Sequence, residues 1–189
     1  MDRKNFLGLG ISTTLGSMLP VSSAFYSAVK SPATLIKPQR LPENATLGLI
    51  APASPIYKDA DFDTMIHNLE SFGYTLKPGK HVRDQRGYLA GTDEDRAADL
   101  HTMFTDNSID GIVCVRGGWG SNRILPLIDF SLIKDNPKVL VGFSDITSLI
   151  LSIQAKTGLV TFHGPVGKSE WNPLTRQAWI DVLHEGKSP

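Results

Sequence analysis

Ser144 occupies a position at which a serine hydroxyl can act as a nucleophile. It lies in residues 141–147, where an apolar strand pattern leads directly into the first turn of a helix. Such a turn lifts the hydroxyl above the end of the sheet, and the helix amides that follow point toward negative charge developing on a bound carbonyl. The hydrolase pattern G-x-S-x-G is not met, because Ile146 stands at its second glycine. The alternative role for Ser144 is to cap the helix.

A second turn between a strand and a helix lies at residues 115–122 and contains Gly117, Gly118 and Gly120. These glycines leave backbone amides uncovered, so a carbonyl oxygen or a phosphate can approach closely. A dinucleotide-binding fingerprint is not formed, because Arg123 occupies the place of its third glycine. From the spacing alone, an anion site and a plain tight turn both remain open.

Two further patterns do not support a nucleotide-binding site or a metal site. Residues 164–169 end like a phosphate-binding loop, but two residues separate the glycines instead of four, so no nucleotide triphosphate site is expected. The histidines show no metal-ligand spacing, and we therefore expect no metal and no cofactor. These histidines are His67, His81, His101, His163 and His184.

The composition is that of a soluble globular protein. The chain has 189 residues, of which 41% are hydrophobic and 20% charged, which excludes intrinsic disorder and a coiled-coil rod. Its 19 basic and 19 acidic residues cancel, so no net field attracts nucleic acid, and we expect no nucleic-acid partner. The one cysteine, Cys114, permits no internal disulfide, and its apolar surroundings predict a buried inert thiol.

Strand and helix patterns alternate along the chain. Apolar runs predict strands near 46–51, 74–77, 109–115, 139–141 and 159–162. Helical periodicity predicts helices over 62–72, after a capping box formed by Thr92 and Asp95, near 121–128, and over 145–156. This alternation predicts an α/β fold with an open, mostly parallel sheet and helices on both faces, in a flavodoxin-like or Rossmann-like layout. The functional site is then expected at the carboxyl ends of the strands.

The first residues have the pattern of an export signal. In residues 1–28, Arg3 and Lys4 precede an apolar run and a small-residue cleavage site. The run is too short to span a bilayer, so we expect no membrane span and an exported protein of the periplasm or cell envelope. An uncleaved apolar N-terminal helix is the alternative. Residues 29–44 are expected to form an extended lead-in.

Five motifs in order resemble the LD-carboxypeptidase family of serine peptidases, which also contains the microcin C immunity proteins. The motifs are residues 50–55, 88–92 with Asp95 and Arg96, 116–120, 142–147 and 163–165. The resemblance covers about residues 40–185 and corresponds to the family's N-terminal domain. It implies an α/β domain over 45–165 and the start of an interdomain link over 166–189.

The resemblance implies a serine carboxypeptidase that releases the terminal D-alanine from murein tetrapeptides during wall recycling. Ser144 matches the nucleophile, and the backbone amides of Gly118 and Asp145 match the oxyanion hole. Gly117 and Trp119 are the residues expected to contact the murein peptide.

The family's base is a histidine oriented by a glutamate, and both come from a C-terminal domain. No residue of this sequence matches either one, so the sequence is expected to be a fragment or a truncated gene product that is inactive alone. A catalytically silent module that binds muropeptide or another small ligand is the alternative function. Full-length members of the family are expected to form homodimers.

Overall fold

A computed structural model describes residues 34–187, and the export signal expected at residues 1–28 lies outside the described residues. Within them, the strands form one sheet in the order β2-β1-β3-β4-β5, with every neighbouring pair parallel. The strands are β1 (Thr46–Ile50), β2 (Thr75–Pro78), β3 (Gly111–Cys114), β4 (Val139–Gly142) and β5 (Phe162–His163). This order is that of flavodoxin-like sheets, so the predicted fold class is confirmed.

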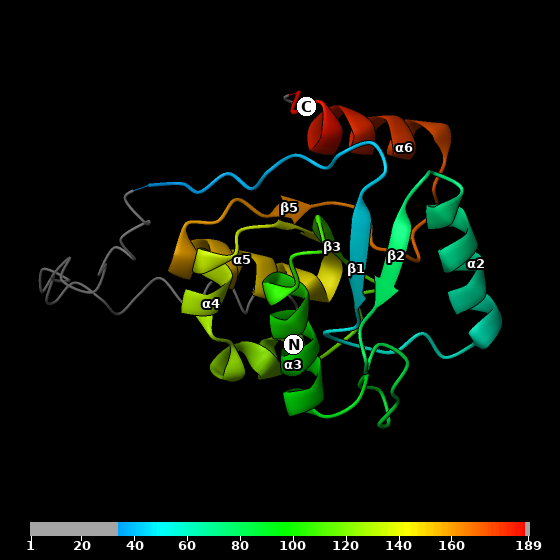
Figure 1. The fold of residues 1–189 in the computed structure, drawn as a ribbon. Helices are drawn as coiled ribbons and strands as arrows, with labels where there is room; N and C mark the ends of the chain where they lie inside the picture. Colours follow the sequence, from blue (N-terminus) through cyan, green and yellow to red (C-terminus); the bar gives the residue numbers. More distant parts are fainter. Residues whose placement is uncertain (1–33, 188–189) are drawn as a thin grey trace, which may run out of the picture. The chain divides into compact units, whose positions relative to one another are not determined.

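Helices cover both faces of the sheet (Figure 1). One face packs against α2 (Asp59–Glu70) and α6 (Pro173–Trp179), and the other against α3 (Asp93–Thr105), α4 (Phe130–Asp135) and α5 (Thr147–Thr157). Successive side chains of a strand point to opposite faces. In β3, for example, Val113 joins the first core, and Ile112 and Cys114 join the second.

The capping box at the start of α3 is present as predicted. The Thr92 hydroxyl accepts from the Asp95 backbone N–H at 3.1 Å, and the Thr92 backbone N–H donates to the Asp95 carboxylate at 3.4 Å. Cys114 in β3 is fully buried, and this burial raises the pKa of its thiol. The prediction of an inert thiol therefore agrees with its surroundings.

Two predicted elements differ from the structure. The helix expected near 121–128 is a 3-10 helix over Ser121–Leu127 that contains Pro126, and the separate α4 follows it. Proline has no N–H to donate, so an α-helix does not continue through it. Asp129 instead caps α4. The strand expected at 159–162 begins later, at Phe162.

The segment expected to begin an interdomain link folds back on the sheet. Trp179 and Leu183 are 5% and 4% exposed, and the Trp179 indole N–H donates to the Tyr74 hydroxyl at 2.8 Å. A π-helical turn over Ile180–His184 follows α6. Leu174, by contrast, is 80% exposed.

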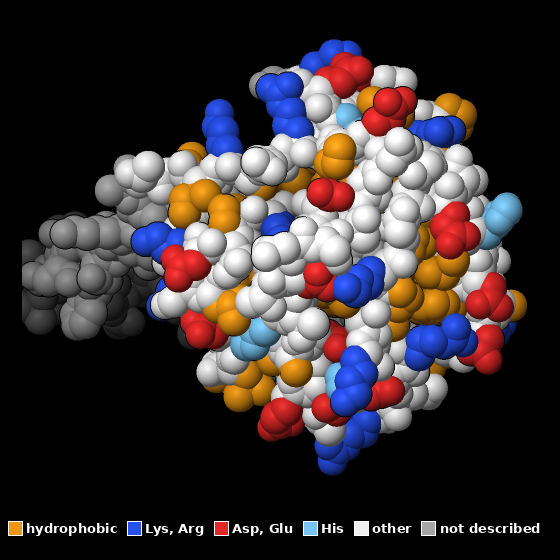
Figure 2. Space-filling model, viewed as in Figure 1, with side chains coloured by type: hydrophobic (Ala, Val, Ile, Leu, Met, Phe, Trp, Pro, Cys, Tyr) orange, Lys and Arg blue, Asp and Glu red, His pale blue; other side chains and the backbone are white. Residues whose placement is uncertain are grey.

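The surface is mixed in charge. On the face shown in Figure 2, acidic and basic side chains are interspersed, with small apolar areas between them. This agrees with the equal numbers of acidic and basic residues in the sequence. In the part of the chain that is described, no helix is both long and apolar enough to cross a membrane.

Candidate active site

Three loops meet at the carboxyl ends of β1, β3 and β4. The loop after β1 contacts the loop after β3, where the Ser54 backbone N–H donates to the Gly117 carbonyl at 3.4 Å. The loop after β3 contacts the turn after β4, where the Ser121 backbone N–H donates to the Asp145 carboxylate at 2.8 Å. The two turns that the sequence marked for chemistry are therefore neighbours in space, at the edge of the sheet where α/β folds place their sites.

Ser144 is held in a strained backbone conformation. Its φ of +63° is the only positive φ of a non-glycine residue in 34–187, and its side chain is exposed. A left-handed conformation costs such a residue roughly 1–2 kcal/mol. Strain of this kind concentrates at functional sites.

The residues around Ser144 produce this turn. Gly142 is required, because a Cβ there would lie 2.5 Å from the Cγ2 atom of Ile146. The chain then enters a 3-10 turn over Ser144–Ile146. Within residues 34–187, the Ser144 hydroxyl makes no hydrogen bond, so it caps no helix in this structure. Ser144 is thus an exposed residue in the turn that follows β4.

Two backbone amides, one in the turn of Ser144 and one in the neighbouring loop after β3, make no hydrogen bond to a described residue. Asp145 lies in the first turn of a helix, where N–H groups have no intrahelical partner. Gly118, in the neighbouring loop, makes no N–H hydrogen bond to any described residue. Glycine is required at this position, because its φ is +120° and because a Cβ here would lie 2.3 Å from the Ser54 Oγ atom. These are the two amides that the sequence analysis assigned to an oxyanion hole.

Asp145 and Ser121 fix the relative position of the two turns. Ser121 is fully buried, and its hydroxyl donates to the Asp145 carbonyl oxygen. The Ser148 hydroxyl also donates to that carbonyl, at 3.1 Å. The Asp145 side chain therefore serves as a structural acceptor, while its backbone N–H stays available.

A buried arginine, Arg96, ties the loops after β1 and β3 to α3. Its guanidinium donates to the carbonyls of Pro52 at 2.6 Å, Gly120 at 3.0 Å and Thr92 at 3.2 Å, and it pairs with Asp93. Burial lowers the pKa of Arg96, and the Asp93 charge opposes this shift.

Arg96 stands in one of the five family motifs, but its role in joining these loops was not predicted from the sequence. The signal was available in the helical spacing. Arg96 precedes Leu100 and Met103 by four and seven residues, so it shares the apolar face of α3. An arginine on such a face must find buried acceptors.

Trp119 projects from the glycine-rich loop and is 72% exposed. Its backbone N–H donates to the Ser54 hydroxyl at 3.2 Å, which anchors the loop beneath the exposed indole. Ser54 itself is 2% exposed, and the sequence analysis did not single out its role. The Trp119 indole lines a hollow together with Tyr88, which comes from the loop before α3.

His163 at the end of β5 is near this edge but does not contact the Ser144 hydroxyl by a hydrogen bond. Its ring lies edge-on to the Phe143 ring, with 6.3 Å between centroids. Neither this histidine nor any carboxylate of residues 34–187 forms a nucleophile–base pair with Ser144.

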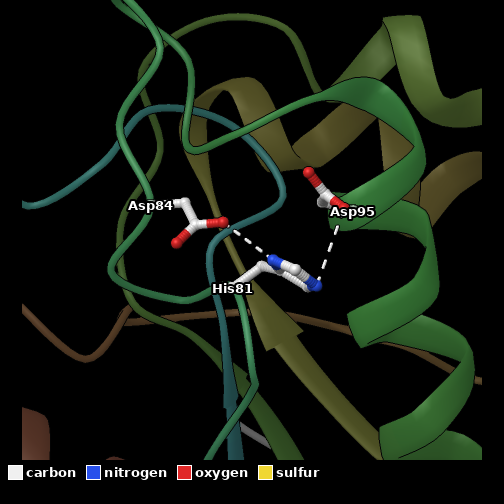
Figure 3. A group of neighbouring side chains, drawn as sticks. All are labelled: His81, Asp84 and Asp95. Carbon is white, nitrogen blue, oxygen red and sulfur yellow. Dashed lines mark hydrogen bonds and ion pairs between the residues drawn. The ribbon is translucent and has the colours of Figure 1, made fainter.

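His81 lies between the carboxylates of Asp84 and Asp95 (Figure 3). Its Nδ1 atom is 2.7 Å from Asp84 and its Nε2 atom 3.6 Å from Asp95, so the three side chains offer donors of the kind that bind a metal. Asp95 also accepts from the Thr92 hydroxyl at 2.7 Å. These bonds explain the cluster structurally, because they join the turn at residues 81–84 to the start of α3. The cluster was not predicted from the sequence, because its members are irregularly spaced.

Comparison with known proteins gives one family. Residues 47–164 match the model of the LD-carboxypeptidase N-terminal domain. The chain is 45% identical over 154 residues to a probable murein peptide carboxypeptidase of Bacillus subtilis, covering 79% of this chain and 48% of that protein. It is 40% identical over 126 residues to a murein tetrapeptide carboxypeptidase of Pseudomonas aeruginosa, covering 66% and 40%.

Among solved structures, the MccF-like protein of Bacillus anthracis matches with a TM-score of 0.75 and 28% identity, over 78% of this chain and 47% of that one. The chain spans about half the length of the relatives that it matches. With the matched segment covering the sheet and the loops around Ser144, the chain belongs to the LD-carboxypeptidase family of peptidases.

Proposed function

We propose that this chain supplies the nucleophile half of a serine LD-carboxypeptidase, which releases the terminal D-alanine from murein tetrapeptides. The observation that carries the proposal is the exposed, strained Ser144 with the free amides of Gly118 and Asp145 in the turns around it. The names of the Bacillus subtilis and Pseudomonas aeruginosa relatives support a murein peptide as substrate.

In this proposal, the Ser144 Oγ attacks the carbonyl carbon of the amide that precedes D-alanine. The carbonyl oxygen takes up the negative charge and accepts hydrogen bonds from the Gly118 and Asp145 N–H groups. The tetrahedral intermediate expels D-alanine, whose amine takes up a proton, and leaves an acyl ester on Ser144 that water then hydrolyses. Each oxyanion donor is worth about 3 kcal/mol of barrier.

The proton of the Ser144 hydroxyl needs a base, and residues 34–187 bring none into hydrogen-bond contact with it. We assign the base to a histidine oriented by a glutamate in a second domain of the kind that the family resemblance implies. The chain alone is then inactive, because loss of the base lowers the rate by about six orders of magnitude in serine peptidases.

The same lack of a base favours one alternative. A chain that keeps the loop at Gly117 and Gly118 but no base would bind muropeptide without cleaving it. Calorimetry on the 189-residue chain tests this: heat on titration with murein tetrapeptide, without D-alanine release in any form of the protein, would favour the binding module.

The carboxypeptidase is tested by joining residues 34–187 to the second half of the Bacillus subtilis relative. We expect the fused protein to release D-alanine from murein tetrapeptide, and the chain alone to release none. Ser144→Ala should abolish release in the fused protein, with an unchanged circular dichroism spectrum. Release that survives Ser144→Ala would remove Ser144 from the nucleophile role.

The proposal includes export to the periplasm or cell envelope, based on the basic and apolar pattern of residues 1–28. Fractionation of cells that express the chain tests it. Recovery of the uncleaved chain in the cytoplasm alone would contradict export.

A further inference from the structure

Ser54, in the loop after β1, contacts three consecutive residues of the loop after β3. Its backbone N–H donates to the Gly117 carbonyl at 3.4 Å, and its hydroxyl accepts from the Trp119 N–H at 3.2 Å. Between these two bonds, a Cβ built on Gly118 would lie 2.3 Å from the Ser54 Oγ atom and 2.5 Å from its Cβ atom. Ser54 is 2% exposed, and it fills the space that a side chain at residue 118 would need.

The two hydrogen bonds hold the two peptide groups on either side of the Gly118 Cα atom. The first peptide group joins the Gly117 carbonyl to the Gly118 N–H, and the second joins the Gly118 carbonyl to the Trp119 N–H. A trans peptide group is planar, and its C=O and N–H bonds point in opposite directions. Because the Gly117 carbonyl faces the Ser54 N–H, the Gly118 N–H points away from Ser54. It has no hydrogen-bond partner among residues 34–187.

The loop that carries Ser54 is itself held on both sides of this residue. On one side, the Arg96 guanidinium donates to the Pro52 carbonyl at 2.6 Å. On the other side, the Arg116 guanidinium donates to the Pro55 carbonyl at 3.0 Å. These bonds leave the loop little freedom to move with the glycine-rich loop, so Ser54 gives that loop a fixed support.

The first of the two peptide groups begins at the residue that lies against Ser144. A Cβ at Gly117 would lie 3.3 Å from the Ser144 Oγ atom. Covalent geometry then places the Gly118 nitrogen within about 7 Å of that oxygen. The amide that Ser54 holds is therefore close enough to reach the oxygen of a carbonyl group under attack by Ser144.

We propose that Ser54 is a positioning residue that fixes the direction of the Gly118 N–H as an oxyanion donor, an inference that rests on the proposed carboxypeptidase function. Ser54 is buried and acts through the glycine-rich loop, not on the substrate. A donor that already points at the developing oxyanion stabilises the transition state without the cost of reorienting during the reaction. Loss of the Ser54 hydroxyl should therefore lower kcat and leave KM unchanged, because the amide binds the oxygen most strongly in the transition state.

The direction of the Gly118 N–H bond can be measured in the 189-residue chain without any reaction. Residual dipolar couplings of the isotope-labelled chain report the orientation of each N–H bond relative to the rest of the protein. Ser54→Ala removes the acceptor of the Trp119 N–H, so we expect the coupling of Gly118 to change while the couplings of β1 and β3 stay the same.

Thr157→Val is the matched control. Thr157 is 4% exposed, and its hydroxyl accepts from the Leu159 backbone N–H at 3.0 Å. It therefore resembles Ser54 in burial and in its bond to a loop amide, but it lies at the end of α5. This variant should leave the Gly118 coupling unchanged.

Kinetics of the fused protein test the role in the reaction. Ser54→Ala should lower kcat for D-alanine release by about tenfold and keep KM within about twofold of the parent value. A peptide boronate, whose boron replaces the scissile carbonyl carbon, should bind this variant about tenfold more weakly, because its oxygen takes the place of the oxyanion. Thr157→Val should lower the melting temperature but change neither kcat nor boronate binding. A merely structural role for Ser54 would give the same pattern as Thr157→Val.

Two results would overturn the proposal. An unchanged Gly118 coupling in Ser54→Ala would show that the hydroxyl does not hold the amide. A changed coupling with an unchanged kcat would show that the direction of this amide does not affect the reaction. Absence of D-alanine release from the parent fused protein is a separate result, which refutes the proposed function, and the coupling alone then decides whether Ser54 directs the Gly118 N–H.

Discussion

Gly117 packs so closely against Ser144 that a Cβ at residue 117 would lie 3.0 Å from the Ser144 Cβ and 3.3 Å from its Oγ. These distances are shorter than ordinary van der Waals contacts, so the absence of a side chain at Gly117 keeps space open beside the hydroxyl. Gly117 therefore allows the loop after β3 to lie in close contact with the turn that holds Ser144.

We predict that Gly117→Ala lowers D-alanine release by the fused protein by at least about tenfold, because the added methyl group displaces the hydroxyl by a few tenths of an ångström. The melting temperature of the variant should remain close to that of the parent. Unchanged release would mean that the Ser144 turn shifts without a catalytic effect.

The backbone strain at Ser144 should appear as a difference in the free energy of unfolding between two variants. Ser144→Gly relieves the cost of a positive φ, about 1–2 kcal/mol, against about 0.5–1 kcal/mol of added chain entropy. Ser144→Ala removes the hydroxyl but keeps the strain. We therefore expect the glycine variant to be more stable than the alanine variant by about 1 kcal/mol in urea unfolding. Equal stabilities would show that φ at this position relaxes without cost.

Arg96→Lys should destabilise the chain by about 2–4 kcal/mol. One ammonium group cannot donate at once to the carbonyls of Pro52, Gly120 and Thr92, so buried acceptors lose their partners. Arg83→Lys is the control, because the Arg83 side chain is 46% exposed, pairs with the surface carboxylates of Asp59 and Asp63, and stacks over the Phe62 ring without donating to any buried carbonyl. A similar loss in both variants would contradict a special role for Arg96.

The stability of the chain should fall as the pH drops below about 6.5. Burial lowers the pKa of His184 in the folded state below its ordinary value of 6.5, so the unfolded chain binds its proton first. The stabilising contribution is fully present above 6.5 and is lost as the pH falls toward the folded-state pKa. Burial lowers the pKa of His101 in the same direction.

Urea midpoints at pH 7.5 and 5.5 test this prediction. His184→Gln and His101→Gln should each reduce the difference between the two midpoints, and the double variant should reduce it further. A difference that neither substitution changes would assign the pH dependence to other groups.

Cys114 should report global unfolding. The thiol is fully buried and burial raises its pKa, so a thiol reagent should label the native chain only when the sheet opens. The labelling rate should rise with urea in parallel with the unfolded fraction, and the denatured chain should bind one equivalent. Rapid labelling of the native chain would contradict this burial.

The sequence by itself determined the order of strands and helices and indicated the two turns in which we propose the chemistry takes place. Apolar runs and helical periodicity are local properties, and Gly142 and the glycines of the β3 loop impose local backbone conformations that are readable one segment at a time. The break at Pro126 and the short β5 were harder to predict, because their limits depend on Asp129 capping and on pairing with β4.

Only the tertiary structure decided which distant residues meet at the site. Ser54 supports Trp119 across 65 positions, and Arg96 reaches the carbonyl of Pro52 across 44. Such contacts depend on parallel strands bringing their carboxyl ends to one edge, and no local pattern specifies which side chains then touch. The same holds for the hollow between Tyr88 and Trp119, because its two walls come from separate loops.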